Sequence, residues 1–281
     1  MNLGMLFCVD SRCVQLIREG SCVAFLLMAL SAEAHEFWLA PSSHTLKKGQ
    51  TVEVYAMIGH GEEAESLVRR SDHLKSFLVY NGQSSEPLTG RNRRLPTGKY
   101  RIMRDGMHVV AYESFPQLNE LPADRFNDYL RKEGLDAVLA AEQIKPKTTG
   151  TTRELYSRFA KCLVRAGDGE GADKALGFPL EVLAVTDPTR MSEGTTMVIQ
   201  ILRDREPMPG LLVKGFALAS EEEASAVRTD EDGYARLILH HSGRWMINVV
   251  YIEPAEESAN AEWQSYWASL TFEVPKMKLT E

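Results

Sequence analysis

Residues 51–58 read TVEVYAMI, and every second side chain in this stretch is apolar. Alternation with a period of two is typical of an antiparallel β-strand that is buried on one face and exposed on the other. The segment MHVVAY, residues 107–112, shows a related pattern and places His108 and Tyr112 on one face. The two stretches therefore predict a β-sandwich, in which each sheet turns one face toward a shared core.

Short extended runs separated by turns continue on both sides of these stretches. In the first part of the chain we expect strands at 36–40, 51–58, 75–80, 98–102 and 108–114. After residue 179 we expect strands at 180–185, 195–202, 211–219, 235–240, 245–251 and 266–274. This spacing predicts a mainly β protein built from two antiparallel β-sandwich domains of the Ig-like type.

Residues 122–141, PADRFNDYLRKEGLDAVLAA, interrupt the strands with apolar side chains at near-helical spacing. Gly134 stands in the middle of the stretch, so two short helices with a turn between them are predicted. Residues 153–165 are ambiguous, because their apolar side chains fit either one helical stripe or a strand entered from a helix.

A glycine-rich run at residues 167–171 is typical of a flexible turn or linker. We place the domain boundary just after it. The N-terminal domain is then expected at residues 35–172, with the helical insertion near 122–141, and the C-terminal domain at residues 176–275.

The first 34 residues have the layout of a secretory signal peptide. Arg12 and Arg18 precede an apolar run at residues 22–30, and the small residues Ala32 and Ala34 follow it. The run is too short to cross a bilayer as a permanent helix, which takes roughly 20 residues. We therefore expect cleavage after Ala34, export to the periplasm, and a mature protein that is not embedded in the membrane.

Charge and cysteine content bear on the partners of the protein. The formal net charge is −7, and a mildly acidic protein lacks the overall basic excess that favours nucleic acids or anionic membranes. Three of the four cysteines precede residue 35, and Cys22 lies before most of the apolar run, which argues against a lipoprotein anchor. Cys162 is the one cysteine that follows the predicted signal peptide, so no internal disulfide is expected. We predict that Cys162 is a small apolar residue buried in the core.

Sequence motifs that carry catalysis are missing. The chain has no Gly-x-Ser-x-Gly elbow, no Walker loop, no His-Glu-x-x-His pair and no Cys-x-x-Cys site. Paired carboxylates for glycoside hydrolysis have no fixed spacing in sequence, because the fold sets their separation. We expect a protein that is not an enzyme.

Several segments, taken in their order along the chain, resemble the DUF4198 family of exported bacterial proteins. These segments are HEFWL at 35–39, the stretch 54–61 ending in Gly-His-Gly, residues 121–139, LGFPLE at 176–181, and residues 229–233 and 243–245. Members of this family are described as periplasmic components of nickel or cobalt uptake systems. The half from residue 180 onward also looks like transthyretin-like sandwiches. The resemblance implies two β-rich domains, a divalent metal ion as ligand and a membrane transporter as partner.

His35 and His60 are the candidate metal ligands. After cleavage, His35 offers its α-amine and its imidazole to one metal ion, and a second imidazole completes a nitrogen-rich site. Both groups of His35 lose their protons readily at neutral pH, since their reference pKa values are about 8 and about 6.5. His60 stands between Gly59 and Gly61, where the backbone permits close approach and the side chain is expected to be accessible. Such a site suits Ni²⁺ or Co²⁺, and Cu²⁺ fits the same donors.

The other histidines are weaker candidates. His44 and His73 lie in polar segments typical of a surface, and His108 shares its strand face with apolar residues, as a partly buried histidine would. His240 and His241 are adjacent, so in a strand they point to opposite faces. Two other functions stay open: a structural or adhesion-type β-sandwich module that binds protein or glycan, and a copper enzyme built on an N-terminal histidine brace.

Overall fold

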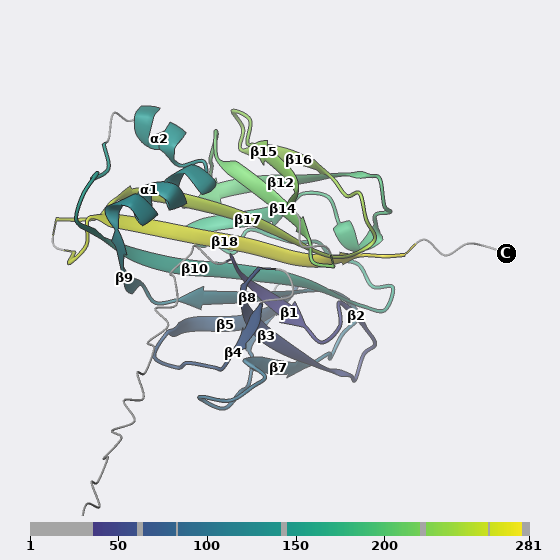
Figure 1. Ribbon diagram of the computed structural model, residues 1–281. Helices are drawn as coiled ribbons and strands as arrows, with labels where there is room; N and C mark the ends of the chain where they lie inside the picture. Colours follow the sequence, from purple (N-terminus) through teal and green to yellow (C-terminus); the bar gives the residue numbers. More distant parts are fainter. Residues whose placement is uncertain are drawn as a thin grey trace, which may run out of the picture. The chain divides into compact units, whose positions relative to one another are not determined.

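The computed structural model describes residues 36–60, 64–82, 84–141, 145–219, 223–257 and 259–276. The predicted signal peptide lies outside these residues. Within the compact unit Ala32–Glu281, the chain is mainly β and most strand pairs are antiparallel, which confirms the predicted fold class (Figure 1).

A four-stranded sheet, called sheet A here, contains the stretch 51–58. Its central strand is β3 (Thr51–Gly59), which pairs antiparallel with β1 (Glu36–Pro41) along one side. Along the other side β3 pairs with β4 (Glu65–Leu67) and β7 (Gly98–Arg101). The inward-facing side chains of β3 are buried, as the alternation predicted: Val52, Val54 and Ala56.

The largest sheet, sheet B, has ten strands and takes them from both halves of the chain. In order across the sheet they are β15 (Glu223–Arg228), β14 (Leu212–Ala217), β17 (Gly243–Pro254), β18 (Trp263–Val274), β10 (Thr151–Ala166), β8 (Gly106–Ser114), β5 (Leu74–Asn81) and β6 (Ser84–Pro87). The short strands β2 (Thr45–Leu46) and β9 (Gln117–Pro122) also pair with β10. Because β10 and β18 pair directly, the two predicted domains share this sheet.

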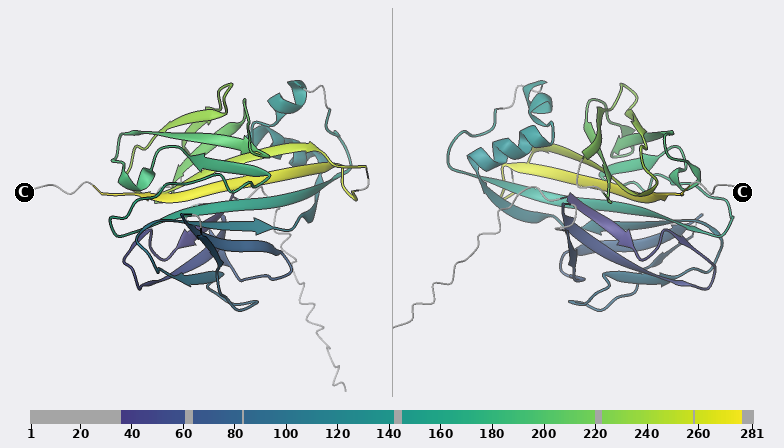
Figure 2. Two further views of the ribbon diagram at one scale, coloured as in Figure 1. Left: turned by 180° about the vertical axis from the view of Figure 1, so that it is seen from behind. Right: turned by 45° about the vertical axis from the view of Figure 1, so that its right-hand side comes forward.

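Sheet C completes the layers. It consists of β11 (Leu180–Ala184), β12 (Thr196–Arg203), β13 (Glu206–Pro207) and β16 (Tyr234–Ile238), and a 3-10 turn (Pro188–Arg190) follows β11. Figure 2 shows sheets A and C on opposite sides of sheet B. Two separate apolar cores result, one between A and B and one between B and C.

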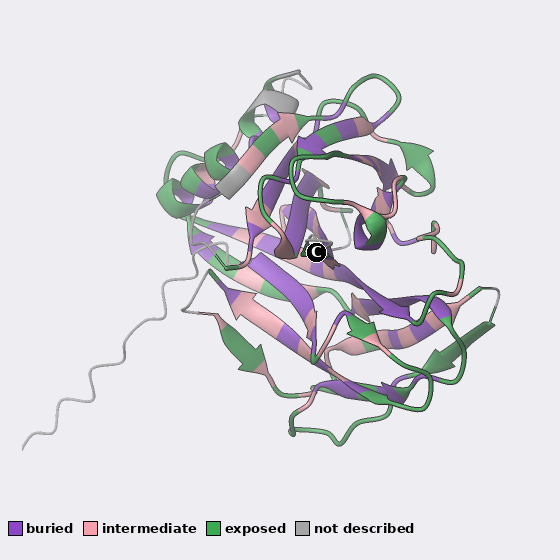
Figure 3. Ribbon diagram, turned by 90° about the vertical axis from the view of Figure 1, so that its right-hand side faces the viewer, coloured by how far each residue is buried: buried purple, intermediate pink, exposed green. Residues whose placement is uncertain are grey.

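The central strands of sheet B are therefore buried on both faces. In β8, Val109 belongs to the core shared with sheet C, while its neighbour Val110 belongs to the core shared with sheet A. The same division occurs in β10, where Leu163 and Cys162 enter the two different cores. Figure 3 shows this buried middle layer. Cys162 is fully buried, which confirms its predicted role as a small apolar residue.

The ambiguous residues 153–165 belong to β10, a strand of 16 residues. A strand that is covered on both faces buries neighbouring side chains, so its period of two disappears from the sequence. In β10 the buried side chains include the charged residues Glu154, Lys161 and Arg165, which obscures the pattern further. The structure shows that residues 153–165 are strand throughout, and β10 contains no helical segment.

The predicted helices are present as α1 (Ala123–Lys132) and α2 (Asp136–Ala141), with Gly134 between them at a φ of 65°. They lie over one end of sheet B (Figure 1). The Phe126 ring packs 5.8 Å from the Trp263 ring, between their centroids. Among the described residues, no helix is long and apolar enough to span a membrane.

Residues 167–179 have no regular secondary structure, but a buried ionic cluster anchors them. The Lys161 ammonium donates to both carboxylate oxygens of Asp173 at 2.8 Å and to Glu181 Oε1 at 3.0 Å. The carboxylate of Glu181 also accepts from the backbone N–H groups of Leu176 and Gly177. The glycine-rich run begins with the predicted turn at residues 167–168, and the residues after the run are fixed to β10 and β11 by this cluster.

Candidate metal-binding site

His60 directly follows the last residue of β3. That residue, Gly59, has a φ of 126°, a conformation that favours glycine, and it is the partner of Glu36 across the β1–β3 ladder. The turn at Gly59 thus brings His60 beside the first residue of β1.

The imidazole of His60 contacts the carboxylate of Glu36 through Nδ1 and Oε2. The His60 side chain is 49% exposed, whereas that of Glu36 is 6% exposed, so a buried carboxylate supports an accessible ring. This contact is an ion pair when the ring is protonated. When the ring is neutral, a carboxylate beside Nδ1 favours the tautomer that carries its proton there and its lone pair on Nε2. Metal-binding histidines commonly use this arrangement, in which one ring nitrogen binds the metal and the other donates to a carboxylate.

Glu36 was not among the residues that the sequence analysis identified. The sequence contains one signal for it, since Glu36 directly follows the candidate ligand His35. Its contact with His60 is a product of strand pairing, because 23 residues of chain lie between the two positions. Only the β1–β3 register brings them together.

His35 lies outside the described residues. Glu36 and Gly59 form the last antiparallel pair of the ladder, and His35 precedes one member while His60 follows the other. The two candidate ligands are therefore the sequence neighbours of a directly paired couple of residues.

The structure corrects the prediction for His44. Its side chain is buried, not on the surface, and its Nδ1 lies 2.8 Å from the carbonyl oxygen of Leu163. Burial lowers its pKa from 6.5 to about 4. The reason is the short parallel pairing of β2 with β10, which draws residue 44 under sheet B, and a polar sequence context gives no sign of such pairing.

The remaining histidines lie where the sequence predicted. His108 is buried and its Nε2 lies 2.9 Å from the carbonyl oxygen of Arg104, while His73, His240 and His241 are exposed or nearly so. In the described part of the chain, no group of three or more His, Cys, Asp or Glu residues could hold a metal ion. A complete site at His60 therefore needs a donor from outside these residues, and His35 is the one that the sequence analysis identified.

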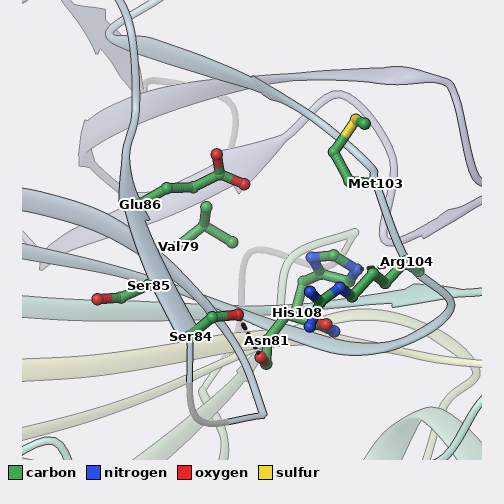
Figure 4. A pocket seen from close by; sticks show the side chains of 8 residues that line it. All are labelled: Val79, Asn81, Ser84, Ser85, Glu86, Met103, Arg104 and His108. Atoms are coloured by element: carbon green, nitrogen blue, oxygen red, sulfur yellow. Dashed lines mark hydrogen bonds between the residues drawn. The ribbon is translucent and has the colours of Figure 1, made fainter.

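A separate pocket of about 280 Å³ opens beside β5, β6 and the β7–β8 loop (Figure 4). It is lined by Val79, Asn81, Ser84, Ser85, Glu86, Met103, Arg104 and His108. Burial lowers the pKa of His108 below its ordinary value. The lining does not include His60, and the pocket is not part of the candidate metal-binding site.

Residues 32–253 match DUF4198, a domain of unknown function. The chain belongs to the DUF4198 family. This match confirms the resemblance found in the sequence, and it includes both Glu36 and His60. Because the family description assigns no activity, the function of this DUF4198 protein has to be argued from the geometry of its site.

The solved structures that this DUF4198 protein resembles have low sequence identities and low TM-scores. The fibronectin(III)-like modules of Clostridium thermocellum CbhA share 10% identity at a TM-score of 0.21, covering 86% of this chain and 97% of that one. The D0-D1 domain of intimin shares 13% sequence identity at a TM-score of 0.21, and the match covers 84% of this chain and 97% of that one. Murine CEACAM1b shares 7% sequence identity at a TM-score of 0.21, and the match covers 86% of this chain and 100% of that one. TM-scores this low are not evidence of a shared function. No curated protein matches the chain.

Proposed function

We propose that this protein is exported to the periplasm and binds a divalent transition metal ion, nickel or cobalt, for a membrane uptake system. Its role in this proposal is non-catalytic. The observation that carries it is the contact between the exposed His60 and the buried Glu36, one residue from His35. Membership of the DUF4198 family is consistent with the proposal, although the family description names no ligand.

The proposed ligands are His60 Nε2 together with the imidazole and the α-amine of His35. Signal cleavage after Ala34 produces this amine, so the site forms only in the processed protein. Three nitrogen donors of intermediate softness suit Ni²⁺ and Co²⁺, and Cu²⁺ binds the same donors. The Glu36 carboxylate positions His60 from behind, and release occurs by ligand exchange at the transporter.

Replacing His60 with alanine is expected to weaken Ni²⁺ or Co²⁺ binding about 10- to 100-fold, which is the cost of losing even an outer partner of a metal ligand. Isothermal titration of the chain that begins at His35 measures this directly. His73→Ala is the matched control, because His73 is also a half-exposed histidine and lies in a different loop. Equal affinities for the two variants would remove His60 from the site.

The role of the terminal amine has its own test. One extra residue before His35 converts the amine into an amide, which no longer binds as a neutral nitrogen donor at pH 7. We expect this extension to weaken Ni²⁺ binding by about tenfold or more while the unfolding transition stays unchanged, since the loss of one good ligand exceeds 1.4 kcal/mol. An unchanged affinity would contradict the proposed chelate.

A further inference from the structure

Seven exposed basic side chains follow β7 and the loops at its two ends. We call them the basic row, and they are Lys47, Lys48, Arg91, Arg93, Arg94, Lys99 and Arg101. The chain as a whole has a formal net charge of −7, so this row is a local reversal of the overall charge. β7 lies on the outer part of sheet A, away from sheet B (Figure 1).

Backbone hydrogen bonds bring the members of the basic row together. Lys99 and Thr89 exchange two backbone hydrogen bonds, of 2.9 and 2.8 Å, which places the loop with residues 91–94 beside one end of β7. At the other end, the guanidinium of Arg101 donates to the carbonyl oxygen of Gly49 at 3.1 Å, directly after Lys47 and Lys48. Lys99 and Arg101 themselves lie on the exposed face of β7.

Within the described ranges, no carboxylate forms an ion pair with any member of the basic row. Other surface cations nearby do have such partners, for example Lys75 with Glu113 at 2.8 Å. Glu53 is the cross-strand neighbour of Lys99, but its carboxylate accepts a hydrogen bond from the Tyr55 hydroxyl at 2.9 Å. The basic row therefore presents its positive charge to an external partner.

Exposed apolar side chains flank the basic row. Met103, two residues after Arg101, is 58% exposed, and Leu95, directly after Arg94, is 46% exposed. Val68 is 41% exposed and precedes Arg69, whose backbone hydrogen-bonds to that of Arg94. Cationic side chains next to exposed apolar ones are the combination that binds the interface of an anionic bilayer, where headgroups meet the cations and the apolar groups enter the acyl boundary.

We propose that the basic row and its apolar neighbours Met103, Leu95 and Val68 form a face that docks on an anionic phospholipid bilayer. The net negative charge of the chain does not prevent this docking, because the Debye length in physiological salt is about 8 Å. The surface potential of the membrane therefore acts mainly on the charges nearest to it, and more distant carboxylates are screened. Net charge alone points away from anionic membranes, but it averages over the whole chain and does not describe one face. This proposal does not depend on metal binding.

Co-sedimentation with vesicles tests the proposal. We expect the protein to bind vesicles of phosphatidylcholine mixed with phosphatidylglycerol, and to bind pure phosphatidylcholine vesicles much less. The test variant is Arg91→Gln/Arg94→Gln/Lys99→Gln. It is expected to lower the partition coefficient for the anionic vesicles by about a hundredfold, since each cation near such a surface contributes about 1 kcal/mol.

The matched control is Arg125→Gln/Lys132→Gln/Lys145→Gln, which removes three exposed cations elsewhere and gives the same net charge. It should bind the anionic vesicles like the unaltered chain. Equal losses in the two variants, or equal binding to neutral and anionic vesicles, would overturn the proposal. Heparin serves as a polyanion without a bilayer: binding to heparin without binding to vesicles would assign the basic row to an anionic polysaccharide and would also overturn it.

Discussion

Replacing Lys161 with methionine is expected to lower the free energy of unfolding by about 3–5 kcal/mol, the range found when one partner of a buried ion pair is removed. Lys161 is 1% exposed, and its carboxylate partners Asp173 and Glu181 are 0% and 1% exposed. Methionine preserves most of the volume of the side chain but removes the charge. Two carboxylates would then remain buried without a cation. Chemical denaturation followed by circular dichroism measures the loss.

An exposed ion pair provides the control for this experiment. Lys147 Nζ lies 2.7 Å from Glu262 Oε1, and the two side chains are 51% and 37% exposed. Water screens such a pair, so Lys147→Met is expected to cost less than about 1 kcal/mol. Similar losses for the two variants would show that the buried cluster contributes no more than a surface pair. If Lys161→Met fails to fold, the combination with Asp173→Asn and Glu181→Gln should restore folding, because it removes every charge of this cluster.

The protonation of Lys161 gives this cluster a pH dependence. Burial alone lowers the pKa of Lys161, but the carboxylates of Asp173 and Glu181 outweigh burial, so the pKa lies above its ordinary value of 10.5. The folded protein thus holds the proton more tightly than the unfolded chain does. The stabilisation is complete below pH 10.5 and disappears as the pH rises through the higher folded pKa.

Acidification from pH 7 to pH 4 is expected to remove about 3 kcal/mol of stability through His44 alone. Burial holds the pKa of His44 at about 4 in the folded protein, against 6.5 ordinarily. Between these values the unfolded chain binds a proton on this ring and the folded protein does not. The contribution of His44 is therefore complete above pH 6.5 and is lost as the pH falls toward 4.

The variant His44→Asn isolates this effect. Asparagine can still donate to the carbonyl oxygen of Leu163, but it does not titrate. Urea denaturation at several pH values between 7 and 4 should show a smaller decline for His44→Asn than for the unaltered chain. The exposed His73→Asn is the control, and its decline should match that of the unaltered chain. Parallel curves for all three proteins would contradict a buried neutral His44.

The local elements of the fold could be predicted where one face of the element is exposed. The alternation in residues 51–58 predicted β3, and the spacing around Gly134 predicted α1 and α2, because exposed positions keep polar residues and make the period visible. Family membership also followed from the sequence, because it depends on the order of short segments.

Other features could not be predicted, because their cause is a contact between distant residues. The strand β10 lost its period through burial on both faces, and His44 became buried through the pairing of β2 with β10. Glu36 was not identified before the β1–β3 register placed it against His60. The members of the basic row lie in separate short segments of the sequence, and the net charge of the whole chain gave no sign of them.

The sequence by itself determined the mainly β class, the two short helices, the family and the candidate ligands His35 and His60. These depend on side-chain periodicity and residue identity, which are local properties. Tertiary structure decided that one ten-stranded sheet serves both halves of the chain, that Glu36 contacts His60, and that the segments carrying the basic row adjoin the two ends of β7. Strand register and burial on two sides arise only when residues far apart in the chain pack together, and no local pattern records them.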